Sequence, residues 1–101
     1  MNTKYCTLSE EQWNATIKNM HGSIFWLLLY KERNDEKLEE YFDFLMFKIG
    51  GLNSLLGYPP KMVDVMMLLE AARMELRKGD EFNFPLYRKA ILDAESAVAK
   101  L

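Results

Sequence analysis

The residues with the clearest chemical potential are the carboxylates of "NDEKLEEYFDF", positions 34–44. Glu36, Glu40 and Asp43 are spaced i, i+4 and i+7, with Glu39 beside them, so a helix would carry three carboxylates on one face. Such carboxylates can bind a divalent cation, but bundle metal sites gather them from several helices, often with Glu-x-x-His pairs. No Glu-x-x-His occurs here. We therefore predict a solvated acidic face and no metal site.

An enzyme remains the alternative interpretation of these acids. The segments "EKLE" at 36–39 and "EEYFD" at 39–43 resemble one helix of the all-helical nucleotide pyrophosphohydrolases, whose Mg²⁺ site uses acidic pairs on two helices. The second pair would have to come from Asp64, Glu70 and Glu75, which are not spaced i, i+3. A metal-dependent hydrolase of this type is therefore kept as the alternative, and we predict no catalytic residue and no cofactor.

The other candidates for chemistry occur singly. His21 is the only histidine, and no serine or cysteine near it forms a recognisable nucleophile arrangement. Cys6 is the only cysteine and cannot form an internal disulfide, which fits a reducing compartment. Gly50-Gly51 and Gly57 lack the strand–turn–helix setting and the lysine of a phosphate-binding loop. We interpret His21 and Cys6 as residues without a chemical role.

The elements that must position these residues are helical. Leu (15) and Met (7) far outnumber Val (3) and Ile (4), and apolar residues recur with a helical period. Ser9 and Gln12 form a capping-box pattern, Gly57 suits a helix C-terminus, and Pro60 suits a first turn. Gly22-Ser23 and Gly50-Gly51 mark positions for a bend or a close helix approach. We predict helices at 10–33, 35–56, 60–78 and 84–100.

Short loops between long helices make neighbouring helices antiparallel. The sequence therefore predicts an all-α fold, a small antiparallel bundle of about four helices in a single domain, 1–101, with residues 1–8 as a flexible tail. The predicted core positions form one stripe on each helix. They are Trp13, Ile17, Met20, Ile24, Leu27, Leu28, Leu38, Tyr41, Phe42, Leu45, Ile49, Leu52, Leu56, Met62, Val65, Met66, Leu69, Ala72, Leu76, Tyr87, Ile91, Ala94, Val98 and Leu101.

Charge and hydropathy exclude several classes of function. The formal net charge is −2 and the basic residues are scattered among acids, so we exclude nucleic acid as the main partner. The N-terminus lacks the apolar segment of a signal peptide. The apolar run from Ile24 to Tyr30 is far shorter than the ~20 residues that cross a bilayer. We predict a cytoplasmic protein with no membrane association.

Apolar residues outside the stripes point to an interface. Phe25, Trp26 and Leu29 lie off the stripe of the first helix, beside Gly22, and Phe44 and Phe47 lie off that of the second. A helix that is apolar all round is either central in its bundle or covered by something else. Wrapping of the first helix by the other three is one alternative. We predict instead that these residues contact another protein, because interface cores are rich in aromatic residues.

The sequence thus predicts a small non-enzymatic protein that acts through protein–protein interaction, as an adaptor, regulator or inhibitor. Self-association as a homodimer is the simplest form of that interaction. The size and class fit a bacterial or phage accessory factor. Besides the metal-dependent hydrolase, a binder of a small apolar ligand among the Met and aromatic side chains is a further alternative.

Overall fold

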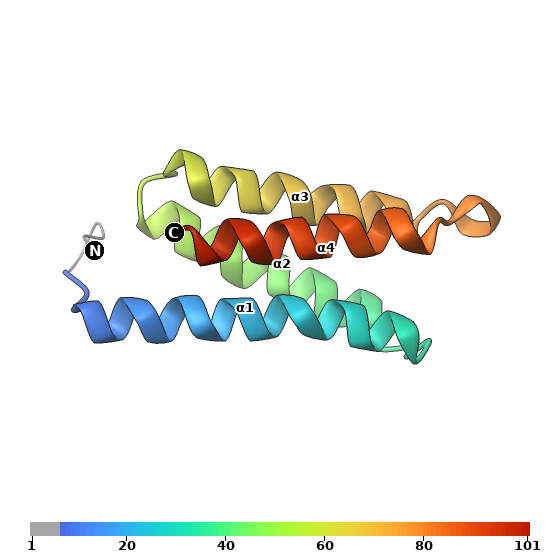
Figure 1. Ribbon diagram of the computed structural model, residues 1–101, viewed down its shortest axis with the longest axis horizontal. Coiled ribbons are helices and arrows are strands. Elements are labelled where there is room, and N and C mark those ends of the chain that lie inside the picture. The colour runs from blue at the N-terminus through green and yellow to red at the C-terminus, as the bar shows by residue number, and fades with distance from the viewer. Residues whose placement is uncertain (1–6) are drawn as a thin grey trace.

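The computed structural model describes residues 7–101 and contains four α-helices in that range (Figure 1). They are α1 (Glu10–Glu32), α2 (Leu38–Leu55), α3 (Pro60–Leu76) and α4 (Phe84–Ala99), and a short 3₁₀ turn, η1 (Gly79–Glu81), precedes α4. Cys6 and most of the predicted N-terminal tail lie outside the described residues. The predicted all-α bundle of four helices is confirmed.

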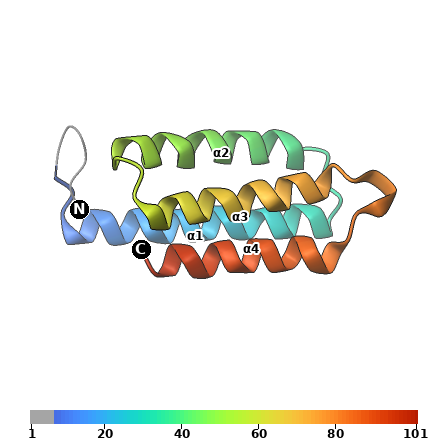
Figure 2. The same ribbon diagram turned by 90° about the horizontal axis from the view of Figure 1, so that it is seen from above.

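Consecutive helices run antiparallel, in an up-down-up-down order (Figures 1 and 2). The bundle is elongated, 46 Å by 21 Å by 21 Å. α4 packs closely against α3 and α1, whereas α2 lies farther from its neighbours α1 and α3. α1 therefore has α2 on one side and α4 on the other, and its remaining face is directed out of the bundle.

The core is formed by the predicted stripes. Ile24, Leu27, Val65 and Leu69 are fully enclosed, and so are the residues of α4 that face them. The other buried apolar residues are Met20, Leu28, Leu38, Phe42, Leu45, Ile49, Met62, Ala72, Tyr87, Ile91, Ala94 and Val98. Eight of the predicted stripe positions are only partly buried: Trp13, Ile17, Tyr41, Leu52, Leu56, Met66, Leu76 and Leu101. Burial of apolar area of this kind is the main favourable term in folding.

The helix ends follow local chemistry. Ser9 caps α1, because its hydroxyl accepts from the Gln12 amide while the Gln12 side chain accepts from the Ser9 amide. α1 stops where Asn34 adopts the left-handed conformation (φ 51), and α2 stops at Gly57 (φ 80). At each stop the amide of the following residue bonds back to a carbonyl of the last turn, which satisfies groups that the helix end leaves unpaired.

Two predicted boundaries were wrong. α2 begins at Leu38 and not at 35, because the Asp35 carboxylate accepts from the Lys37 amide and holds residues 35–37 in a turn. α3 ends at Leu76 instead of 78, and Gly79 (φ 62) starts η1. α1 is continuous through Gly22-Ser23, and α2 is continuous through Gly50-Gly51. Within residues 7–101, no helix is long and apolar enough to span a membrane.

Candidate protein-interaction surface

The outer face of α1 carries three of the predicted interface side chains. Phe25 and Trp26 keep 41% and 42% of their surface exposed, and Leu29 is half-buried beside them. A Cβ atom added at Gly22 would meet no heavy atom within 4 Å, so this part of α1 is open. Wrapping of the first helix by the other three, the alternative considered from sequence, does not occur within the described chain.

The outer face of α2 carries two more of the predicted interface side chains, Phe44 and Phe47. Phe44 is 60% exposed and Phe47 is 81% exposed. Phe44 lines a hollow with Tyr30 and Tyr41 and so leans toward α1. Phe47 is three residues farther on, about 60° around the helix, on the side where Asp43 pairs with α3. The six predicted residues therefore do not form one patch: Trp26 and Phe44 flank the α1–α2 groove, and the others face away from it.

Four aromatic side chains line or flank this groove. The sequence predicted two of them, Trp26 and Phe44, as interface residues, but not Tyr30 and Tyr41. The ring of Trp26 lies 5.6 Å from that of Tyr30, and Tyr30 meets Tyr41 edge-on at 4.9 Å. The Tyr41 hydroxyl donates to the Ser23 carbonyl oxygen over 2.8 Å. Burial raises the pKa of Tyr41 above its ordinary value, so its hydroxyl stays a proton donor at neutral pH. We call Trp26, Tyr30, Tyr41 and Phe44 the aromatic groove.

Cations accompany the aromatic groove. The guanidinium of Arg33 lies 5.7 Å from the centre of the Trp26 ring, and the ammonium of Lys48 lies 5.7 Å from that of Phe44. Both distances are within the range of a cation–π attraction. Lys37 lines the adjoining hollow, whose volume is about 400 Å³. The groove therefore combines apolar rings with positive charge in a chain whose net charge is −2.

A second hollow of about 230 Å³ lies farther along the same groove, toward the start of α1. Its walls come from α1 and α2 only. The lining includes Thr16, Asn19, Ser23, Leu45, Lys48 and Leu52. Lys48 lines this hollow and also reaches the Phe44 ring of the aromatic groove, so it connects the two.

The acidic cluster lies in solvent, as predicted. Glu36, Glu39 and Glu40 are exposed, and Asp43 pairs with Arg73 of α3 at 2.7 Å. Of the three acids of α3, Glu70 is exposed and the other two are directed to α4. Asp64 lines a groove against α4, and Glu75 is directed to the start of α4. Among residues 7–101, no three His, Cys, Asp or Glu side chains lie close enough to hold a metal ion.

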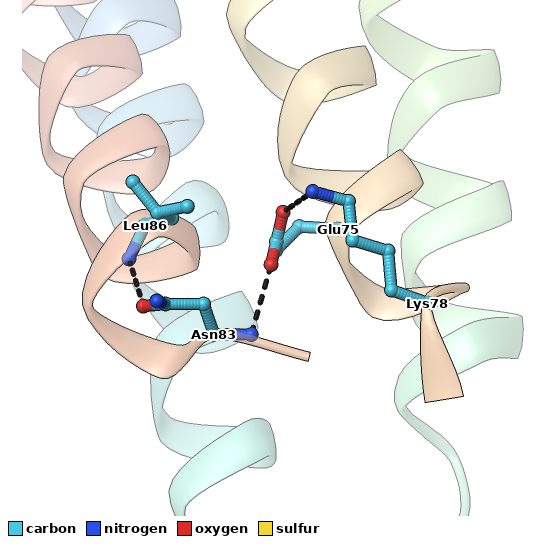
Figure 3. Close-up of polar contacts among 4 residues, drawn as sticks. All are labelled: Glu75, Lys78, Asn83 and Leu86. Atoms are coloured by element: carbon cyan, nitrogen blue, oxygen red, sulfur yellow. Dashed lines mark hydrogen bonds and ion pairs between the residues drawn. The ribbon is translucent and has the colours of Figure 1, made fainter. Parts of the chain in front are cut away.

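Glu75 connects the end of α3 to the start of α4 (Figure 3). Its carboxylate accepts from the Asn83 amide at 2.8 Å and pairs with the Lys78 ammonium at 2.6 Å. Asn83 in turn caps α4 by accepting from the Leu86 amide. The Lys78 ammonium, followed by the Asn83 amide, holds the pKa of Glu75 below its ordinary value. This buried carboxylate is structural, because all of its oxygen contacts serve the α3–α4 turn.

His21 has a partner that the sequence did not reveal. Its Nε2 lies 3.2 Å from Oε2 of Glu95 on α4. Burial raises the pKa of Glu95, and the nearby His21 lowers it by a smaller amount. Oε1 of Glu95 is buried and has no hydrogen-bond partner among residues 7–101. The pair joins α1 to α4 on the side of α1 away from the aromatic groove.

Three buried polar residues escaped the sequence prediction. Glu95 follows Ile91 by four positions, Asn53 follows Ile49 by four, and Glu75 follows Ala72 by three. Each therefore lies on an apolar stripe. A polar residue at such a position could have been predicted as buried from the sequence. The His21 contact was not predicted for the same reason, since Glu95 was not recognised as buried.

A further hollow, a groove of about 900 Å³, lies between α3 and α4. Its lining includes two lysines and two aspartates, Lys61, Asp64, Asp93 and Lys100. Lys61 donates to the Lys100 carbonyl oxygen, and Lys89 pairs with Asp93.

Comparison of this chain with protein-family models, with curated proteins and with solved structures found no match.

Proposed function

We propose that this chain is a non-enzymatic helical protein that acts by binding other proteins, as an adaptor, regulator or inhibitor. One observation supports it above the rest: Phe25, Trp26, Phe44 and Phe47 keep between 41% and 81% of their surface exposed on α1 and α2. Large aromatic side chains carry much of the energy of protein interfaces. Interface cores are enriched in aromatic side chains relative to the rest of a protein surface. A cytoplasmic location accompanies the proposal, since the single cysteine fits a reducing compartment.

A second copy of the chain is the partner we propose first. A two-fold interface needs only one self-complementary surface. Phe25 and Leu29 lie on the outer face of α1 with Gly22 one turn away, where an added Cβ atom would meet no atom of residues 7–101 within 4 Å. Phe25 and Leu29 would be at the centre of such a dimer, and the absence of a side chain at Gly22 would allow two α1 helices to approach closely.

Light scattering tests this proposal. The parent is expected at twice its chain mass of 11.9 kDa at micromolar concentration. The variant Phe25→Glu with Leu29→Lys is expected to be a folded monomer by light scattering and circular dichroism. The matched control is Leu86→Glu with Met67→Lys, which places the same charges on exposed apolar residues of α4 and α3 and should stay dimeric. A monomeric parent would refute self-association, and an unfolded double variant would assign Phe25 and Leu29 to the core.

A further inference from the structure

We propose that the groove between α1 and α2 is a docking site for an acidic amphipathic helix of a partner protein. This inference rests on the proposed function, because it presumes that the chain acts by binding proteins. It concerns a different surface from the dimer contact. Phe25 and Leu29 lie on the outer face of α1, whereas Trp26 and Tyr30 turn toward α2.

The shape of the groove fits a helix. The aromatic hollow and the second hollow lie in a row between the same two helices, and Asn19 and Tyr30 mark their positions on α1. These residues are 11 positions apart, which corresponds to about 16 Å along a helix axis, or three turns. An occupant of three to four turns would place apolar side chains into both hollows from one face, the usual way in which a helix occupies a groove.

The walls also restrict the backbone of the occupant. Both sides of the groove are α-helices, whose amides and carbonyls are already bonded along each helix. An extended peptide would lose water from its own amides and find few partners in exchange. A helical occupant satisfies its backbone internally, so it is the form of peptide that this groove favours.

The charges select an acidic occupant. Lys37 and Lys48 line the two hollows, and Glu40 is the one carboxylate among the residues that line them. Arg33 adds a third cation beside them, over the ring of Trp26. Arg33 and Lys48 each lie over an aromatic ring, so a partner that places a carboxylate there would meet a cation already held in position. Complementary charge at an interface mainly sets specificity and association rate.

Two other assignments fit less well. The larger α3–α4 groove presents two lysines and two aspartates, so it selects no sign of charge. Single-stranded nucleic acid also uses aromatic rings with cations. Here, however, Tyr30 and Tyr41 pack edge-on against each other, and Trp26 and Phe44 each already have a cation over the ring. The chain as a whole is also negative. The acidic helix is the occupant that the shape and the charge both support.

Selection from a peptide library tests the proposal and needs no identified partner. The library displays helical peptides of about 14 residues, four turns, in which apolar positions are spaced i, i+4, i+7 and i+11 and all other positions are random. The bait is the whole parent chain. Enriched peptides are expected to contain an excess of Asp and Glu over Lys and Arg. A synthetic enriched peptide should shift the NMR signals of Trp26, Tyr41 and Lys48.

Two variants assign the binding to the groove. Lys37→Glu with Lys48→Glu should weaken binding of the enriched peptide roughly tenfold or more, which corresponds to about 1.4 kcal/mol. Lys37→Met with Lys48→Met removes the charges without reversing them and keeps an aliphatic side chain at each position. This variant should also weaken binding of the enriched peptide, and it separates the loss of positive charge from any effect of charge reversal on the fold. The matched control, Lys61→Glu with Lys100→Glu on the α3–α4 groove, should leave the affinity within roughly twofold of the parent.

Several results would overturn the assignment. Enriched peptides that are neutral or basic would contradict the selection of an acidic occupant. Peptides that bind the parent and the Lys37 and Lys48 variants with equal affinity would show that the binding site lies elsewhere. A fluorescent oligothymidylate that binds the parent and loses affinity in the Lys37→Glu, Lys48→Glu variant would assign the groove to nucleic acid. The light-scattering result on Phe25 and Leu29 is independent of all these readouts. Failure of the docking proposal is therefore distinguishable from failure of the self-association proposal.

Discussion

The Tyr41 hydroxyl donates a 2.8 Å hydrogen bond to the Ser23 carbonyl oxygen and so joins α2 to α1. Tyr41 lines one hollow of the α1–α2 groove, and Ser23 lines the other. The bond therefore connects the two helices between the sites where we expect apolar side chains of a partner. α2 packs less closely than α4, so single contacts of this kind matter for its position.

Tyr41→Phe removes this bond and keeps the ring. We expect a loss of about 0.5–1.5 kcal/mol in the free energy of unfolding, the usual net value of one hydrogen bond. Urea denaturation measures it. Tyr58→Phe is the control, because the Tyr58 hydroxyl is exposed and makes only a long 3.4 Å contact to Ser54. A loss at Tyr41 no larger than that at Tyr58 would show that the bond does not hold α2.

Truncation of core leucines tests the bundle itself. Leu45 on α2 is 3% exposed, and Leu69 on α3 is fully buried. Leu45→Ala and Leu69→Ala should each lower the free energy of unfolding by ~2–5 kcal/mol, since each leaves a cavity. Leu86 is 53% exposed, and its change to Ala should cost less than about half a kcal/mol. Equal small losses at all three positions would contradict the placement of the stripes.

Two buried carboxylates should respond to pH in opposite directions. The pKa of Glu75 is lowered by Lys78 and Asn83, so its ionised form stabilises the fold above the ordinary value of 4.5. This stability is lost as the pH falls through the lowered pKa. Glu75→Gln should therefore reduce Tm at neutral pH, and the difference from the parent should shrink as the pH falls below 4.5. Thermal unfolding followed by circular dichroism measures the difference.

The pKa of Glu95 is shifted in the opposite direction to that of Glu75. Burial raises its pKa, so the folded state favours the protonated form and ionisation costs stability above the raised pKa. Glu95→Gln should increase Tm at neutral pH, because an amide carries no charge to desolvate. The gain should disappear as the pH falls below 4.5, where the carboxyl is protonated in both states. A decrease of Tm at neutral pH would mean that the His21 contact outweighs burial.

The acidic face of α2 should bind no metal tightly. Glu36→Gln, Glu40→Gln and Asp43→Asn together should leave the fold intact, with a loss of about 1 kcal/mol or less from the exposed Asp43–Arg73 pair. Calorimetry of the parent with Mg²⁺, Mn²⁺ and Zn²⁺ should find no stoichiometric site. A site in the parent that the triple variant abolishes would favour the metal-dependent hydrolase instead.

The sequence predicted the helices well because their determinants are local. The apolar period, the Ser9–Gln12 capping box and Gly57 act within a turn or two of chain, and the structure agrees at each. The start of α2 was missed because Asp35 accepts from the Lys37 amide in a turn, whereas the same residue could equally have capped a helix. Local patterns do not distinguish these two uses.

The surface was only partly predictable. The off-stripe positions of Phe25, Trp26, Phe44 and Phe47 follow from the helical period, and all four are exposed. Their division between separate faces depends on how α1 and α2 are rotated against each other, which no single helix specifies. The cations over the rings and the His21–Glu95 pair depend on residues distant in sequence, so only the folded chain reveals them.

Disulfide trapping tests the central claim, that the outer face of α1 is an interface between two copies. In a Cys6→Ser background, Gly22→Cys adds a thiol where a new Cβ meets nothing within 4 Å. Ala71→Cys is the control, on the exposed surface of α3. Under mild oxidation we predict rapid formation of a covalent dimer by the Gly22→Cys chain alone, and its loss when Phe25→Glu and Leu29→Lys are added. Equal rates for the two cysteine positions would contradict the account.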